Sequence, residues 1–543
     1  MRERITFVQK LGDSLEPSAV QVNDGSITAP EIDAIREDRL TFALDELPPE
    51  LQTLLKATPE LHIRWVSATA YDTVSPLISR LPPGFHVFYT PGGDDAAPTT
   101  LCPNLARIFG DVSCSTPAES FTSLPRDRFS HAPALQYFQQ LDSLLPFVQY
   151  AKGQLCRATD SSCSARLDNL STASSLDISY DSASQLLRTT ALWPYQRRPV
   201  HATSRSHHRT EVGILSADKP KILEPHEIGI SGLLTVLGQD TKPSPTMFAF
   251  PARHRDAESS FSARFLSPSG LHPTLQLRLS SSKLSAFPSS PSSSSSSSDN
   301  DNTNSCTLHT YLTLPRTIFA DKYQLSDPVF LASKNLTALR YTTQPVDLEA
   351  PAYVLPQWGS AILLDLASPP PPSARRAGAQ EKEEEEEWTA EIPLHLRYLS
   401  PAPGGYGSVE VPYPAVFWAC EPDDDDQLPS DRLPGGPFDR TSLGYDSLFK
   451  PGTVFWHVEP RPAVSSSSSA GNGGARLVSE VRVPVLDLER AGWVNIGTAA
   501  AVLVGFAWVA WRLAGVWWRE GYGVAGGGGR GQEEKEAEEK KRQ

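Results

Sequence analysis

The sequence predicts a mainly β protein: an antiparallel, β-sandwich-like domain that follows an α+β amino-terminal region and precedes one carboxy-terminal transmembrane helix. Short stretches in which apolar and polar residues alternate are typical of strands with one buried face. Segments rich in proline and glycine separate these stretches, as turns do in antiparallel sheets. One long, uncharged apolar run lies late in the 543-residue chain.

The amino-terminal region, residues 1–200, combines strand and helix patterns. RITFVQ (4–9), LHIRWVSA (61–68) and GFHVFYTP (84–91) are predicted strands. A helix is predicted from apolar residues at helical spacing, namely Leu135, Phe138, Leu141, Leu145 and Val148. Pro146 should bend or end that helix, because its ring removes a backbone donor and clashes with the preceding turn.

Residues 212–489 form the predicted β-rich domain. Its strands are LQLRL (275–279), TLHTYLTL (307–314), IPLHLRYL (392–399) and SEVRVPV (479–485). In the strand predicted at 307–314, alternation places Leu308, Thr310, Leu312 and Leu314 on one face and His309, Tyr311 and Thr313 on the other. In the strand predicted at 392–399, it places Ile392, Leu394, Leu396 and Tyr398 on one face. Pro393 and Pro484 indicate edge strands or bulges. Trp418, Phe455 and Trp456 are predicted core residues.

Three inserts interrupt this domain and are predicted to be disordered: 285–305, 367–387 and 464–474. They are rich in serine, proline, glycine or glutamate and carry too little apolar surface to offset the entropy of ordering. The net charge of −14 and the pI near 5.4 argue against nucleic-acid binding, which needs a basic face.

The apolar run AGWVNIGTAAAVLVGFAWVAW (491–511) is a predicted membrane span. As a helix it would be about 31 Å long, close to the ~30 Å hydrocarbon core. A charged tail, 512–543, follows it, so the run is not the terminal signal of a glycolipid anchor. Gly497, Ala501 and Gly505 form small-residue pairs that would let a second helix approach closely.

The orientation of this span is less constrained by the residues. The start, MRERITFVQK, has the pattern of a strand and lacks the apolar core of a secretory signal. A tail-anchored protein with its bulk in the cytosol is therefore one alternative. The other is a luminal bulk, which is favoured by two glycosylation acceptor sites, at Asn169 and Asn335.

The six cysteines also fit an oxidising compartment. Their spacings match no common zinc pattern. We predict disulfides within two close pairs, Cys102 with Cys114 and Cys156 with Cys163, which leaves Cys306 and Cys420 to each other. Other pairings remain open, because connectivity does not follow from spacing.

The sequence predicts no catalytic, cofactor-binding or metal site. The chain has no glycine-rich phosphate loop, HExxH helix, GxSxG elbow or CxxC pair. His207 and His208 lie in a polar stretch and are interpreted as exposed. Asp299 and Asp301, like the run 423–426, lie in loop-like sequence that would not hold a metal rigidly.

One stretch of the sequence indicates a particular protein family. TLHTYLTLPRTIFADKYQLSD (307–327) contains a motif made of Leu314, Pro315, Arg316, Asp321, Tyr323 and Leu325. With GLHPTLQLRL (270–279), PLHLRYLSP (393–401), VEVPYPAVFWAC (409–420) and a late membrane span, this order resembles the PIG-X family, including its fungal branch. HEIGISGLLTVLGQD (226–240) is also similar to the fungal members.

The resemblance implies a luminal ectodomain on a single endoplasmic-reticulum membrane helix with a cytoplasmic tail. It implies a non-catalytic subunit, without cofactor, that stabilises the multi-spanning catalytic subunit of glycosylphosphatidylinositol (GPI) mannosyltransferase I. That enzyme adds the first mannose to glucosaminyl-phosphatidylinositol in GPI-anchor biosynthesis. Two alternatives are a general luminal chaperone for secretory and membrane proteins and an enzyme that itself acts on lipid-linked sugars.

Overall fold

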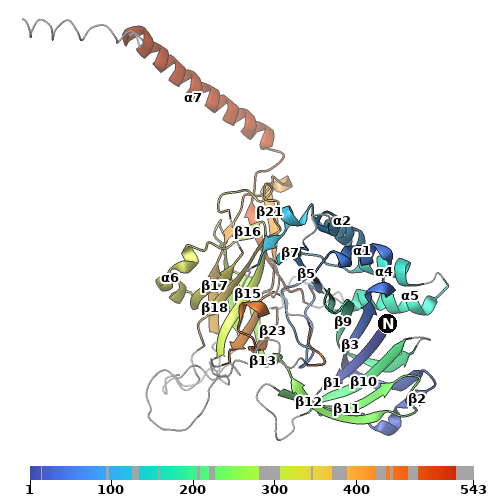
Figure 1. Ribbon diagram of the computed structural model, residues 1–543. Helices are drawn as coiled ribbons and strands as arrows, with labels where there is room; N and C mark the ends of the chain where they lie inside the picture. Colours follow the sequence, from blue (N-terminus) through green and yellow to red (C-terminus); the bar gives the residue numbers. More distant parts are fainter. Residues whose placement is uncertain are drawn as a thin grey trace, which may run out of the picture. The chain divides into compact units, whose positions relative to one another are not determined.

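The computed structural model describes residues 1–10, 12–13, 15–92, 97–124, 134–156, 159–204, 208–218, 227–280, 306–343, 347–369, 388–422, 436–440, 444–462 and 475–520. All of inserts 285–305 and 464–474, most of insert 367–387, and residues His207, Asp299, Asp301 and 423–426 lie outside these ranges. The chain forms two compact units, one of residues 1–399 and 408–483 and the other of residues 400–407 and 484–543. The protein is mainly β, as predicted (Figure 1).

The first sheet of the larger unit has twelve strands, in the order β12-β11-β10-β1-β3-β9-β8-β4-β5-β7-β6, with β2 on β3. They are β1 (Arg2–Gln9), β2 (Gln21–Asn23), β3 (Ser26–Ala43), β4 (Glu60–Val66), β5 (Gly84–Thr90), β6 (Thr122–Ser123), β7 (Leu135–Gln139), β8 (Ser175–Asp181), β9 (Leu186–Thr203), β10 (Arg209–Asp218), β11 (Glu227–Val236) and β12 (Ser244–Pro251). Among the described residues of this sheet, the β1–β10 pair is parallel and the other strand pairs are antiparallel. The predicted strands at 4–9, 61–68 and 84–91 are confirmed as β1, β4 and β5.

The predicted boundary between residues 200 and 212 does not separate two sheets. Strands β10, β11 and β12 extend the first sheet, because β10 pairs with β1 at the start of the chain. The next sheet begins only at His254. An alternating pattern reveals that a segment is a strand but not which partner it joins, and the partner here is about 200 residues away.

Helices α1 (Pro49–Lys56), α2 (Ala97–Phe109), α3 (Pro117–Ser120), α4 (Leu145–Leu155) and α5 (Ser161–Asp168) accompany this sheet. α2 packs on α4, and α4 packs on α5 (Figure 1). The helix predicted across 135–148 is wrong. Its first part is strand β7, which pairs with β5, and helix α4 begins at Leu145. Pro146 lies in the first turn of α4, where its missing N–H costs nothing.

The second sheet has eight strands, in the order β17-β18-β15-β22-β23-β13-β14-β19. They are β13 (His254–Phe265), β14 (Thr274–Leu279), β15 (Cys306–Pro315), β17 (Leu336–Thr342), β18 (Gly359–Leu366), β19 (Trp388–Pro393), β22 (Ala415–Cys420) and β23 (Val454–Pro460). Two small sheets pair β16 (Ile318–Phe319) with β20 (His395–Leu396) and β21 (Tyr406–Pro412) with β24 (Val478–Pro484). Pro393 and Pro484 end edge strands, as predicted.

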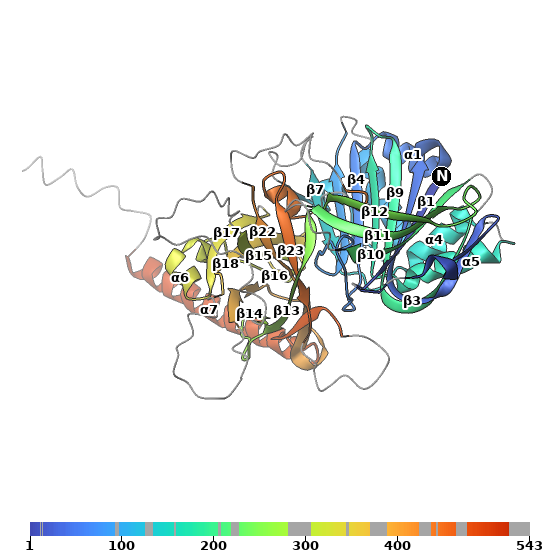
Figure 2. The ribbon, with the colours of Figure 1, turned by 90° about the horizontal axis from the view of Figure 1, so that it is seen from below.

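Strands β17, β18, β15, β22 and β23 of the second sheet follow one another in Figure 2. Its two edge strands, β17 and β19, come together through the turn that precedes β17. The Glu391 amide donates to the Lys334 carbonyl at 3.0 Å, and Asn335 Nδ2 donates to the Thr389 carbonyl at 2.7 Å. The Lys334 ammonium also pairs with the Glu391 carboxylate at 2.6 Å.

The two sheets share one apolar core. Trp65 and Phe85 from the first sheet belong to the same buried cluster as Phe417 and Phe455 from the second. Strand β15 is therefore buried on both faces. Its His309, Tyr311 and Thr313, predicted to lie on an exposed face, are 0–1 % exposed. The sequence predicts alternation correctly in β15 but not the second layer that covers its polar side. Trp418 and Phe455 are core residues as predicted, and Trp456 is half-buried.

The smaller unit contains one long helix, α7 (Ala491–Glu520). It includes the predicted span 491–511 but continues nine residues farther, so residues 512–520 are helical and the tail begins later than predicted. This is the one helix among the described residues that is long and apolar enough to cross a membrane, and none of its apolar window is buried. At about 1.5 Å per residue its length exceeds the ~30 Å hydrocarbon core.

Candidate interaction surface

The predicted motif begins where β15 ends. Leu314 is fully buried, and Pro315 lies opposite Gly359, the first residue of β18. Gly359 has a φ of +149°, and a Cβ atom there would lie 2.0 Å from the Leu314 carbonyl oxygen. The two backbones can approach this closely only because one of them carries glycine. The first half of the motif therefore closes the end of a strand pair.

The second half of the motif forms a compact turn after β16. One Asp321 carboxylate oxygen accepts the Tyr323 amide at 2.8 Å, and the Asp321 carbonyl accepts the Leu325 amide at 3.0 Å. Leu325 is fully buried. Arg316 and Tyr323 are the motif residues with exposed side chains, and Tyr323 is 68 % exposed. Most of the motif thus serves the fold, and two residues face solvent.

Backbone hydrogen bonds join the motif segment to residues 396–398, and these residues to two further segments. The Arg397 amide donates to the Thr317 carbonyl at 2.9 Å, and its guanidinium lies 4.3 Å from the Phe319 ring centroid. Ala352 bonds to Tyr398 at 3.0 Å, and Leu396 to Leu271 at 3.0 Å. His395 contacts Gln324 and His272, and burial, followed by the charge of His272, lowers the pKa of His395.

These joined segments expose several large apolar or aromatic side chains. We call this group the tyrosine surface: Leu271 (51 % exposed), Tyr323 (68 %), Tyr353 (62 %), Val354 (62 %) and Tyr398 (69 %). Tyr398 was predicted to lie in line with the buried residues of its strand, but the regular strand ends at Leu396, and Tyr398 turns outward. Exposed aromatic side chains on linked segments are typical of protein contact sites. Of this group, only Tyr323 belongs to the predicted motif, while Leu271 and Tyr398 lie in other stretches that resemble the family.

One buried constellation has the residue types of a catalytic relay. His254 Nδ1 lies 2.9 Å from His457 Nε2, and His254 Nε2 lies 3.1 Å from an Asp446 oxygen. Burial, and then the charge of His254, hold the pKa of His457 well below its usual value. Among the described residues, no serine or cysteine side chain bonds to either histidine. The network joins β13 to β23 inside the core, and His457 Nδ1 is buried without a hydrogen-bond partner among the described residues.

No group of three or more potential metal ligands occurs among the described residues.

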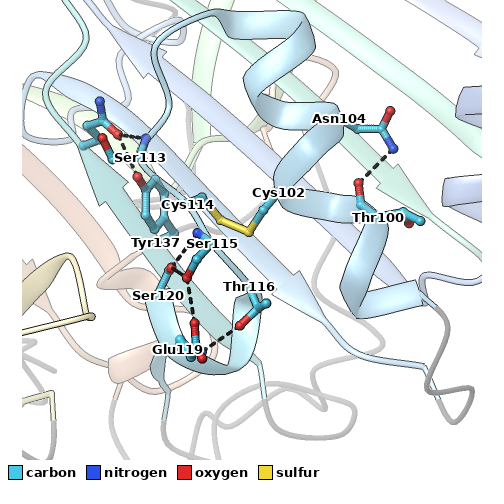
Figure 3. The surroundings of a disulfide bond; sticks show 11 residues. Thr100, Cys102, Asn104, Ser113, Cys114, Ser115, Thr116, Glu119, Ser120 and Tyr137 are labelled. Carbon is cyan, nitrogen blue, oxygen red and sulfur yellow. Dashed lines mark hydrogen bonds between the residues drawn. A yellow bond between two sulfur atoms is a disulfide. The ribbon is translucent and has the colours of Figure 1, made fainter.

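The six cysteines form three disulfides, Cys102–Cys114, Cys156–Cys163 and Cys306–Cys420, which are the pairs favoured by the sequence. The first fixes α2 to the segment before α3 (Figure 3), where the Thr116 hydroxyl accepts the Glu119 amide at 3.3 Å. All three disulfides tie elements of the larger unit.

Both acceptor asparagines are exposed. Asn169 begins a short 3-10 turn after α5, and its backbone carbonyl accepts the Trp193 indole N–H at 3.0 Å. The Asn335 side-chain nitrogen, which is the atom that a glycan would modify, already donates to Thr389. The geometry therefore makes Asn169 the freer of the two acceptors.

Comparison with known proteins adds a family assignment. Residues 268–514 match the model of the family described as PIG-X / PBN1. The chain is 56 % identical to "Protein pbn1" of Neurospora crassa over 524 residues, which cover 96 % of this chain and 97 % of that protein. It is 45 % identical to "Protein PBN1" of Gibberella zeae (95 % and 96 % covered) and 26 % identical to "Protein PBN1" of Yarrowia lipolytica (94 % and 95 % covered).

Proposed function

Because the chain belongs to the PIG-X / PBN1 family, which is associated with GPI-anchor biosynthesis, we propose that it is the accessory, non-catalytic subunit of GPI mannosyltransferase I. It binds and stabilises the multi-spanning catalytic subunit, which transfers the first mannose to glucosaminyl-phosphatidylinositol. The observation that supports this proposal is the tyrosine surface, in which Tyr323 of the family motif and exposed side chains on linked segments suit contact with a protein.

Stabilisation of this kind needs no chemistry. A partner that binds the folded form of the catalytic subunit, but not its unfolded form, shifts the folding equilibrium by mass action. The tyrosine surface stands on segments fixed by the β16–β20 pair. A rigid surface loses little conformational entropy on binding, so more of its contact energy remains as affinity.

We further propose that the protein is a single-pass protein of the endoplasmic-reticulum membrane, with the larger unit in the lumen. Helix α7 supplies the membrane span. Three disulfides and two exposed glycosylation acceptors suit the oxidising lumen. Five tryptophans, at 493, 508, 511, 517 and 518, are 58–80 % exposed on α7, and tryptophan favours the two membrane interfaces.

The proposal predicts that polar replacement of the tyrosine surface releases the partner. A triple variant, Tyr323→Ser, Tyr353→Ser and Tyr398→Ser, should recover at least tenfold less catalytic subunit on affinity purification, since about 1.4 kcal/mol already gives a factor of ten. The control variant, Leu234→Ser with Met247→Ser, removes exposed apolar side chains of the first sheet and should recover the partner normally. Equal recovery of the catalytic subunit with both variants would show that the tyrosine surface does not bind it.

The same purification separates this function from its alternatives. A dedicated subunit yields one dominant multi-spanning protein, whereas a general luminal chaperone yields many unrelated clients. The enzyme alternative requires the isolated chain to transfer sugar from a lipid-linked donor without any partner, and we expect no turnover in that assay.

A further inference from the structure

A cleft of about 440 Å³ opens on one face of the first sheet, and arginines form most of its wall. Strands β1, β3 and β9 are neighbours there, and paired residues cross them in successive rows. The rows are Arg2, Thr41 and Arg188, followed by Arg4, Arg39 and Thr190. Because residues two apart on a strand point to the same face, the sheet presents four arginines on one face.

A distant segment, residues 436–440, forms the other wall. The Pro437 carbonyl accepts the guanidinium of Arg4 at 2.6 Å and that of Arg39 at 3.1 Å, and the Phe438 carbonyl accepts Arg39 at 3.1 Å. Arg440 itself lines the cleft, with 7 % of its side chain exposed. The segment is held in place, so the cleft has two fixed walls.

Positive charge exceeds negative charge around this cleft. Arg4 and Arg39 lie directly opposite each other on β1 and β3, an arrangement that costs free energy unless it is compensated. Fully buried Glu37 compensates in part, at 3.2 Å from Arg4, 3.5 Å from Arg39 and 3.7 Å from Arg440. The charged groups that line the cleft and their ion-pair partners are Arg2, Arg4, Arg39, Arg64, Arg188, Arg209 and Arg440 against Glu37, Asp177, Glu211 and Asp439. They carry seven positive charges and four negative ones.

Hydrogen-bond donors are also in surplus. Nε of Arg4 and of Arg39, and one terminal nitrogen of Arg440, are buried without a hydrogen-bond acceptor in the part of the chain that the structure describes. Burial lowers the pKa of Arg39, Glu37 opposes that shift, and Arg4, Arg440 and Arg188 add to it. The Arg188 side chain is exposed, and within the part of the chain that the structure describes its guanidinium has no ion pair or hydrogen bond, while its backbone is held between β3 and β8.

We propose that this arginine cleft binds a phosphorylated polar ligand, a phosphate ester carried on a body the size of a sugar or polyol. Guanidinium groups match the oxygens of phosphate with paired hydrogen bonds. β1 and β9 are two strand spacings apart, roughly 10 Å, so Arg2 and Arg188 reach into the cleft from the two sides of β3. The volume of the cleft lies in the usual range for such ligands. The phosphate belongs either to a soluble ester or to a lipid headgroup.

This inference is independent of the proposed function and is tested on the full chain in phosphatidylcholine nanodiscs. Isothermal titration with inositol 1-phosphate should show binding that weakens as salt rises, whereas inositol without phosphate should not bind. Arg188→Gln should weaken binding at least tenfold. Arg197→Gln, on the same strand but 77 % exposed and outside the cleft, is the matched control and should bind normally.

A second arm identifies the source of the phosphate. Vesicles of phosphatidylcholine that contain phosphatidylinositol are offered to the same nanodiscs, and their capture is measured by flotation. Capture that inositol 1-phosphate displaces assigns the cleft to a lipid headgroup, and binding of the soluble ester alone assigns it to a soluble ligand. Binding of neither probe, or equal binding by wild type and Arg188→Gln with unchanged melting temperatures, overturns the proposal.

Discussion

Asp177→Ala is expected to lower the free energy of unfolding by about 3–5 kcal/mol, the usual cost of removing one partner from a buried ion pair. Asp177 on β8 is 7 % exposed. One of its carboxylate oxygens accepts Arg64 Nε, and the other accepts Arg440 at 2.6 Å. Alanine would leave two buried guanidiniums without their shared carboxylate. Urea unfolding followed by tryptophan fluorescence measures the change.

The control for this prediction is an exposed ion pair on the same sheet. Asp33 pairs with Lys10 at 3.1 Å, and the two side chains are 41 % and 55 % exposed. Asp33→Ala should therefore cost less than about 1 kcal/mol, because water screens such pairs. If Asp177→Ala costs no more than Asp33→Ala, the buried ion pairs of Asp177 with Arg64 and Arg440 do not stabilise the fold as predicted.

The second large effect is expected from the disulfide Cys306–Cys420. It joins directly opposite residues of β15 and β22 that are 114 positions apart in the sequence. In the chain-entropy model, a crosslink that closes a loop of about 100 residues stabilises the fold by roughly 4.7 kcal/mol, chiefly by restricting the unfolded chain. The double variant Cys306→Ser, Cys420→Ser should lose about that much stability in urea under non-reducing conditions.

A shorter disulfide is the matched control. Cys156–Cys163 closes a loop with a sequence separation of only 7. The same model assigns it roughly 2–3 kcal/mol. The double serine variant of this pair should therefore have its urea midpoint between those of wild type and the Cys306/Cys420 variant. A reversed order would show that loop entropy does not govern these crosslinks.

Local patterns predicted the strands well, because alternation depends on residues that are close in sequence. The strand patterns at 275–279 and 479–485 correspond to β14 and β24. The patterns did not predict which strands pair with each other, because strand pairing depends on contacts between distant segments. This explains the misplaced boundary before β10. It also explains the helix wrongly predicted across 135–148, where Leu135 and Phe138 of β7 match a helical spacing although helix α4 begins only at Leu145.

The candidate sites also differ in how far the sequence could predict them. The motif around Leu314 and Tyr323 is contiguous, so it could be found in the sequence. Tyr353 and Tyr398 join it only through hydrogen bonds of the folded chain. The arginine cleft had no sequence signal, because Arg2, Arg188 and Arg440 are brought together from three distant parts of an overall acidic chain. A net charge of −14 conceals a local positive surplus.

The central claim is that this chain acts by stabilising a partner. The most direct test is the half-life of the catalytic subunit of GPI mannosyltransferase I, measured by pulse-chase after the chain is depleted, with the messenger RNA of that subunit as a control. The account predicts a half-life several-fold shorter, which is restored by the wild-type chain but not by the Tyr323/Tyr353/Tyr398 triple variant. An unchanged half-life in depleted cells would contradict it.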